Sequence, residues 1–276
     1  MVIDETCDTR GDIAGRKRSD VYREVTDLSV QSFEMYARWI GADHLYSDQP
    51  YFTDLGKVDR NNPLSHVCVL YDVLRIIYDP LFDEYDKVLF VDTDIIVNTK
   101  KSIFDVSDAD VAGVYESNII TGKGGGYNSW DYATDKLQMI TRKHDKFDVP
   151  VIPALPPLHP SKVSIMNTGV MVWQRDARLE AREKFLDWRE WCAEGVDNGD
   201  HPWVNNDQVF LSGQMHQYLD VECIDQTWND SPPHYETEEE GLKSNFLHYT
   251  GGDYKMIMLE QAERGYFPIF NGSLGK

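Results

Sequence analysis

The sequence predicts an α/β domain in which a mostly parallel sheet is flanked by helices. Over the first 115 residues, short runs rich in Val, Ile and Phe alternate with segments whose apolar residues recur at helical spacing. Alternation of strands and helices favours parallel pairing, with the helices covering the faces of the sheet. The chain has 276 residues, 41% of them hydrophobic, which suits one large domain with its own core.

The first elements follow from periodicity and from residues that end helices. Met1–Thr6 is expected to be a short strand, and the apolar spacing across Asp20–Ile40 predicts a helix. Gly41 ends that helix, and Asp43–Tyr46 is expected to be a brief strand. A second helix is predicted over Leu64–Tyr78, before a proline that interrupts it.

The clearest strand candidate is Lys87–Thr99, which reads K-V-L-F-V-D-T-D-I-I-V-N-T. Its apolar flanks are typical of a buried strand, where two carboxylates are costly unless positive charge meets them. If the strand ends here, Asp92 and Asp94 lie at its carboxyl end, where open α/β sheets bind ligands. Close oxygen ligands suit Mg²⁺ or Mn²⁺. The alternative, a solvated turn, fits the apolar flanks less well.

The remaining chain begins with a long segment, 116–162, rich in glycine and aromatic residues, which we interpret as a hinge or lid, with a solvated linker as the equal alternative. A strand over Val163–Trp173 is expected to break at its Asn-Thr-Gly, and Asp176 is expected to cap a helix that runs to Cys192. The later expected elements are a strand at Asp110–Tyr115, a helix at Val204–Met215, strands at Tyr218–Ile224 and Ser244–Tyr249, and a helix at Asp253–Arg264.

Composition excludes several classes of partner. The formal net charge of −20 repels nucleic acid and anionic membrane surfaces. No run of apolar residues is long enough for a membrane span, and the N-terminus lacks the apolar core of a signal peptide. We therefore expect a soluble, cytoplasmic protein, although a catalytic domain trimmed of an anchor would look the same. Nothing in the sequence sets the oligomeric state.

The four cysteines are far apart in the sequence, and free thiols in a reducing compartment are the expectation. Asn229 begins a formal glycosylation triplet, Asn-Asp-Ser, of a kind that also occurs by chance.

Several polar groups interrupt apolar sequence, and each alone has a structural explanation such as a cap, a bulge or a core histidine. Together and in this order they resemble the fold-type-A (GT-A) glycosyltransferases, closest to family 8 of the retaining nucleotide-sugar enzymes. The resemblance covers about Ser65 to Lys255. It is carried by Arg75, Asp92 and Asp94, then Asn167-Thr168-Gly169-Val170, then Asp207-Gln208, and finally His248, Gly251 and Lys255.

The resemblance implies a divalent metal, Mn²⁺ or Mg²⁺, held by Asp92, Asp94 and His248, with the imidazole favouring Mn²⁺. The metal would bridge the phosphates of a nucleotide diphosphate, with a UDP-sugar as the implied donor, and act as a Lewis acid on the leaving group. Lys255 would add a charge to the same diphosphate. Further contacts to the nucleotide donor are implied for Thr6, Asp8, Arg75, Thr93 and Gly251.

The resemblance also implies a sugar site and a reaction. Asn167, Thr168 and Asp207 would bind sugar hydroxyls, and Asp207 and Gln208 are the implied catalytic residues. A hexose would pass to a hydroxyl acceptor, with retention as the family's usual outcome. The implied division is a single GT-A domain over 1–276, with a nucleotide-binding half at 1–115, the insertion at 116–162 and an acceptor-binding half at 163–276.

Three alternatives stay open from the sequence. An inverting transferase of the same fold would use an acid such as Asp207 as its base. A nucleotide-sugar-binding protein without turnover would keep the fold and lose the chemistry. A metal phosphoesterase would ordinarily need more His and Asp ligands than the sequence offers. One departure from the family pattern concerns Lys255, which follows His248 by seven residues where several members have six.

Overall fold

A computed structural model describes residues 17–49, 51–52, 68–115, 166–190, 207–232, 237–272 and 274. The predictions for the first strand, for Thr6 and Asp8 and for the segment 116–162 lie outside these residues.

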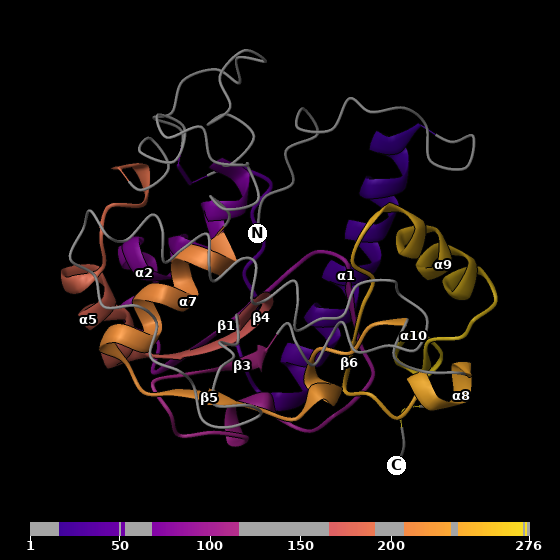
Figure 1. Ribbon diagram of the computed structural model, residues 1–276. Coiled ribbons are helices and arrows are strands. Elements are labelled where there is room, and N and C mark those ends of the chain that lie inside the picture. The colour runs from indigo at the N-terminus through magenta and orange to yellow at the C-terminus, as the bar shows by residue number, and fades with distance from the viewer. Residues whose placement is uncertain are drawn as a thin grey trace, which may run out of the picture.

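The described chain is a mixed α/β structure, as the sequence predicts (Figure 1). Its first part comprises α1 (Arg18–Ile40), η2 (Cys68–Leu74), α2 (Arg75–Tyr78), η3 (Pro80–Phe82), β1 (Lys87–Val91), β2 (Ile95–Val97), η4 (Ile103–Asp105) and β3 (Val111–Tyr115). Its second part comprises β4 (Met166–Gln174), α5 (Arg175–Lys184), α7 (Asp207–Tyr218), β5 (Val221–Cys223), η6 (Gln226–Trp228), α8 (Glu238–Gly241), β6 (Phe246–His248), α9 (Gly252–Glu263) and α10 (Pro268–Asn271).

The larger sheet has the strand order β1-β4-β3-β5, and a second sheet pairs β2 with β6. β4 is antiparallel to both β1 and β3, while β3 and β5 are parallel. β1, β3 and β5 therefore share one direction, which agrees with the expected parallel orientation. The neighbours differ from the expectation, because β4 lies between β1 and β3 and makes those two pairings antiparallel.

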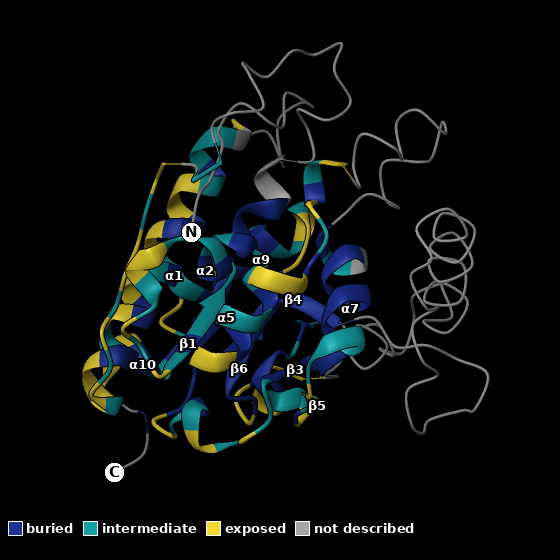
Figure 2. Ribbon diagram, turned by 90° about the vertical axis from the view of Figure 1, so that its left-hand side faces the viewer, coloured by how far each residue is buried: buried dark blue, intermediate teal, exposed yellow. Residues whose placement is uncertain are grey.

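Alternation along the strands divides the core between the two faces of the larger sheet. Met171 and Trp173 of β4 pack with α2, α5 and α7 on one face. Val170 and Val172 face the other way, onto α1, β2, β6, α9 and α10. Figure 1 shows these two groups of helices on opposite sides of the sheet, and Figure 2 shows β3, β4 and much of α7 as buried.

The first predicted helix is confirmed as α1, and Gly41 ends it in the left-handed conformation with φ 72°. The expected strand at Asp43–Tyr46 is wrong: this segment pairs with none of the described strands, and a strand needs a hydrogen-bonded neighbour. The described part of the second predicted helix, Cys68–Tyr78, winds first as the 3₁₀ helix η2 and then as the single α-helical turn α2.

The break expected at Asn167-Thr168-Gly169 is also wrong, because β4 runs through these residues. The irregularity lies in the facing strand, where the register shifts between Gly113 and Tyr115. A Cβ on Gly113 would approach the Sδ of Met166 to 2.6 Å, so β3 and β4 pack too closely there for a side chain.

The helix predicted from Asp176 toward Cys192 is shorter than expected. α5 ends at Lys184 because Phe185 turns to an extended conformation and buries its ring in the core. Asp176 lies in the first turn of α5, and Gln174 is the N-cap residue. No described helix is both long and apolar enough to cross a membrane. The thiol of Cys223 is partly buried and donates to the carbonyl of Ile224 at 3.7 Å.

Candidate metal centre

The Asp92–Asp94 turn is where the chain passes from one sheet to the other. β1 ends at Val91 in the four-stranded sheet, and β2 begins at Ile95 in the two-stranded sheet. The backbone N–H of Asp92 donates to the carbonyl of Gly169 at 2.9 Å, and the N–H of Tyr249 donates to the carbonyl of Asp94 at 2.8 Å. Each aspartate is thereby fixed to a different sheet.

His248 completes a cluster of potential metal ligands with these two aspartates. It is the last residue of β6 and pairs with Ile95. Its Nε2 lies 3.1 Å from Asp94 Oδ1 and 3.7 Å from Asp92 Oδ2. One potential ligand atom from each of the three residues lies within 4.8 Å of the other two. This is the single cluster of this kind in the part of the chain that the structure describes.

The cluster fits a divalent cation on chemical grounds. Asp94 Oδ1 is buried and lies 3.1 Å from His248 Nε2, so either a proton on the ring or a cation must compensate its charge. Two ligands at about 2.1 Å from an octahedral ion are about 3 Å apart, which matches the distance between His248 Nε2 and Asp94 Oδ1. The side chain of His248 is 2% exposed, whereas that of Asp92 is 42% exposed. A cation here would be enclosed on the histidine side and open to a ligand near Asp92.

Lys255, in the first turns of α9, supplies positive charge beside the cluster. Its Nζ donates to Asp94 Oδ2 at 2.5 Å and lies 5.2 Å from the centroid of the Tyr22 ring. The two oxygens of Asp94 therefore have different surroundings: one meets an ammonium group, and the other faces the histidine.

The charges in this cluster shift one another's pKa values. Burial, and then the charge of Asp94, raises the pKa of Asp92 to about 6. Burial alone would also raise the pKa of Asp94, but Lys255 and His248 outweigh it and hold that pKa well below its usual range. Burial opposes the charged form of His248, yet Asp94 and Asp92 raise its pKa. Without a metal, a proton on Nε2 meets the same carboxylates.

Gly169 is the residue that lets the cluster close up. A Cβ at this position would lie 2.5 Å from Cε1 of His248 and 2.9 Å from Asp92 Oδ2. Only a residue without a side chain allows β4 to run this close to the histidine and the aspartate.

Asn229 is a site residue that the sequence did not single out, except as the start of a glycosylation triplet. Its side chain is fully buried, with Oδ1 at 2.8 Å from Nδ1 of His248 and Nδ2 at 2.9 Å from Oδ1 of Asn167. Asn167 therefore hydrogen-bonds to Asn229, the residue that contacts His248. The resemblance implies only a sugar-binding role for Asn167. No signal in the local sequence could have found Asn229, because it follows η6 and meets His248 only through the fold.

The predicted catalytic pair lies at the start of α7. The Thr168 hydroxyl donates to Asp207 Oδ2 at 2.5 Å, and both side chains are buried. Burial raises the pKa of Asp207 to about 7, against the effect of the Thr168 hydrogen bond. Gln208 follows Asp207 in the same helix and is partly exposed.

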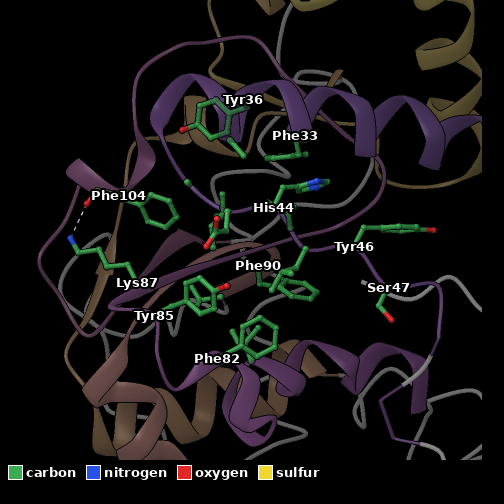
Figure 3. Close-up of a pocket in the computed structure, with 18 of the residues that line it drawn as sticks. Phe33, Tyr36, His44, Tyr46, Ser47, Phe82, Tyr85, Lys87, Phe90 and Phe104 are labelled. Atoms are coloured by element: carbon green, nitrogen blue, oxygen red, sulfur yellow. Dashed lines mark hydrogen bonds between the residues drawn. The ribbon is translucent and has the colours of Figure 1, made fainter.

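Arg75 and Thr93, two predicted donor contacts, line a cavity of about 690 Å³ that Asp92, Asp94 and His248 do not line. Figure 3 shows Phe33 and Tyr36 of α1 on one side of this cavity and Phe82 and Tyr85 on the other. Arg75 pairs with Asp79 at 3.0 Å. This cavity is thus mainly apolar, and the three potential metal ligands do not form part of its lining.

No protein-family model matches the chain, and no curated protein matches it. Several solved structures are similar to it, and two of them are glycosyltransferases. The apo structure of the WbbM bifunctional glycosyltransferase matches with a TM-score of 0.34 and 16% identity over 66% of this chain, which spans only 31% of that one. Mouse xyloside xylosyltransferase 1, also in its apo form, matches with a TM-score of 0.37 and 14% identity over 83% of this chain and 73% of that one. Similarity this low assigns no function.

Proposed function

We propose that the protein is a metal-dependent glycosyltransferase that moves a hexose from a UDP-sugar to a hydroxyl acceptor with retention. The observation that carries this proposal is the arrangement of Asp92, Asp94 and His248. Buried Oδ1 of Asp94 and Nε2 of His248 lie 3.1 Å apart, a separation that two ligands of one cation would have, and the more exposed carboxylate of Asp92 lies at the open side.

Asp92, Asp94 and His248 would hold the ion, which suits Mn²⁺ because one ligand is an imidazole. When bound, the metal would neutralise the diphosphate and act as a Lewis acid on the leaving group. This compensation matters for a protein of net charge −20, which otherwise repels an anionic donor.

The start of α9 offers a second contact for the diphosphate. Gly251 precedes this helix with φ 91°, and the N–H groups of a helix N-terminus favour anions. Lys255, four residues further on, brings an ammonium group to Asp94, beside the proposed metal ligands. In the donor complex, Lys255 would exchange part of its contact with Asp94 for a phosphate oxygen.

Asp207, Thr168, Asn167 and Gln208 would bind and orient the transferred sugar. A carboxyl group with a pKa of about 7 can either donate to or accept from a sugar hydroxyl near neutral pH. Gln208 would lie beneath the anomeric carbon and stabilise its positive charge as the diphosphate leaves. A transferase needs no further ligands for a second metal, unlike many phosphoesterases.

Calorimetry with UDP and GDP, each with and without Mn²⁺, tests the proposal, followed by an assay of sugar transfer or donor hydrolysis. The matched variants are Asp94→Asn and Asp108→Asn, because Asp108 is a fully exposed aspartate outside the cluster. We expect tight UDP binding only with Mn²⁺, a loss of more than about 100-fold in Asp94→Asn, and no change in Asp108→Asn. Metal-independent binding that survives Asp94→Asn would contradict the proposal. Binding without any turnover would instead support a silent sugar-nucleotide-binding protein.

The inverting alternative has one observation in its favour. Asp207 is buried with a pKa near 7, which suits a general base at neutral pH. NMR of the product's anomeric configuration separates the two reactions.

A further inference from the structure

The two ring nitrogens of His248 have different neighbours. Nε2 faces Asp94 and Asp92, and Nδ1 faces Oδ1 of Asn229 at 2.8 Å. In a neutral imidazole one nitrogen carries the proton and the other a lone pair, and the partner of each nitrogen decides which is which. Only the nitrogen with the lone pair can bind a metal.

Which nitrogen of His248 carries the proton can be deduced by starting from a backbone N–H, which can only donate a hydrogen bond. The N–H of Gly169 can only donate, and it lies 2.9 Å from one side-chain atom of Asn167, which must then be the oxygen Oδ1. That oxygen is 2.9 Å from a side-chain atom of Asn229, which must therefore be the amide nitrogen. The other end of Asn229 is then its oxygen, so Nδ1 of His248 must carry a proton, and in the neutral ring Nε2 carries the lone pair.

Burial makes this chain of hydrogen bonds hard to replace with water. All three polar residues of this chain are buried in the protein interior: Asn167, Asn229 and His248. The backbone around Asn229 is fixed as well, because Asp230 bridges to Leu247 and accepts from the N–H of His248 at 2.6 Å. An amide that cannot move and cannot be hydrated holds one orientation.

We infer that Asn229 is a positioning residue, which holds His248 in the tautomer whose Nε2 lone pair points at Asp92 and Asp94. This inference rests on the proposed metal site. Outer hydrogen bonds of this kind fix the ring orientation of a metal-binding histidine, and losing one typically weakens metal affinity about 10–100-fold. An aspartate at position 229 would not be equivalent, because it would place an oxygen against Oδ1 of Asn167.

The first test is the affinity for Mn²⁺ alone, measured by electron paramagnetic resonance on the wild type, Asn229→Ala and Asn98→Ala. Asn98 is a matched control because it is also buried and its Nδ2 donates to the carbonyls of Leu242 and Ser244, outside the cluster. We expect Asn229→Ala to bind Mn²⁺ about 10–100-fold more weakly and Asn98→Ala to bind within about twofold of the wild type. A folded Asn229→Ala protein with wild-type affinity would overturn the inference.

The second test needs no variant. In protein labelled with ¹⁵N-histidine, Zn²⁺ serves as a diamagnetic probe, and we expect it to shift Nε2 of His248 while Nδ1 keeps its proton. A shift that shows Zn²⁺ on Nδ1 contradicts the inference. A wild type that binds neither Mn²⁺ nor Zn²⁺ at His248 contradicts the metal site itself, so the two failures are distinguishable.

Discussion

The two sides of the Asp92–Asp94 turn are built in opposite ways. On the carboxylate side, His248 and Lys255 converge on the aspartates in a small, highly charged cluster that is open to solvent at Asp92. On the other side, Thr93 borders the cavity of about 690 Å³, whose walls are mainly apolar. The comparison teaches that the charged side chains gather outside this apolar cavity, so the cavity alone would point to a different place.

The largest expected effect comes from filling the space that Gly169 leaves. Gly169→Ala would push His248 and Asp92 apart, and we expect about 100-fold weaker Mn²⁺ binding and a loss of about 1–3 kcal/mol in the free energy of unfolding. Gly213→Ala in α7 is the control, since a Cβ there meets nothing within 4 Å. It should leave Mn²⁺ binding unchanged and add about 0.4–1 kcal/mol of stability. Equal Mn²⁺ affinity in both variants would show that close packing at Gly169 is unrelated to the metal.

Lys255→Met separates two roles of one ammonium group. Without its positive charge next to Asp94, Mn²⁺ alone should bind more tightly, because two cations no longer compete for one carboxylate. UDP in the presence of Mn²⁺ should bind about 10–100-fold more weakly, because a charged hydrogen bond to phosphate is lost. Titrations of both ligands, with exposed Lys243→Met as control, check the opposite signs. A parallel fall of both affinities would indicate a purely structural lysine.

Asp207 predicts a pH dependence of stability in the metal-free protein. Folding raises its pKa from 3.8 to about 7, so the folded state binds more protons than the unfolded state between these values. The Asp207 contribution is fully present below pH 3.8 and is lost as pH rises toward 7 and above. Asp207→Asn should remove this loss and gain a few kcal/mol relative to the wild type at pH 8, at about 1.4 kcal/mol per unit of pKa.

Urea unfolding in chelator at several pH values measures this difference. The exposed Asp108→Asn should follow the wild-type profile, and an Asp207→Asn profile parallel to the wild type would show that the carboxyl group is not shifted.

The smallest effect belongs to the cavity side. Thr93→Val removes one hydroxyl without changing the carboxylates, so Mn²⁺ affinity should stay within about twofold, whereas UDP affinity should fall about 2–10-fold through one lost neutral hydrogen bond. Titration of Mn²⁺ and then UDP checks both. A large loss of Mn²⁺ affinity would mean that the two sides of the turn are not independent.

The sequence predicts some of these features better than others. Periodicity locates α1, β1 and α9, because their apolar residues report which face is buried. It does not locate β4 between β1 and β3, since strand order depends on the packing of the whole chain. The expected strand at Asp43–Tyr46 failed for the same reason, because local β propensity supplies no partner strand.

The site divides in the same way. The order of motifs singles out Asp92, Asp94 and His248, and the structure brings these three side chains together. Asn229 carries no such signal: its partners, Asn167 and His248, are 62 and 19 residues away in the sequence. A residue that orients a metal-binding side chain is chosen by three-dimensional packing. The metal-binding residue itself can be found in the sequence, because it is a polar residue within an apolar run.

The central claim is that Asp92, Asp94 and His248 hold one metal ion. Anomalous diffraction from a crystal grown with Mn²⁺ and UDP tests it most directly. We expect a single manganese peak within about 2.0–2.3 Å of an oxygen of Asp92, Oδ1 of Asp94 and Nε2 of His248. A manganese peak away from His248, or none at full UDP occupancy, would contradict the claim.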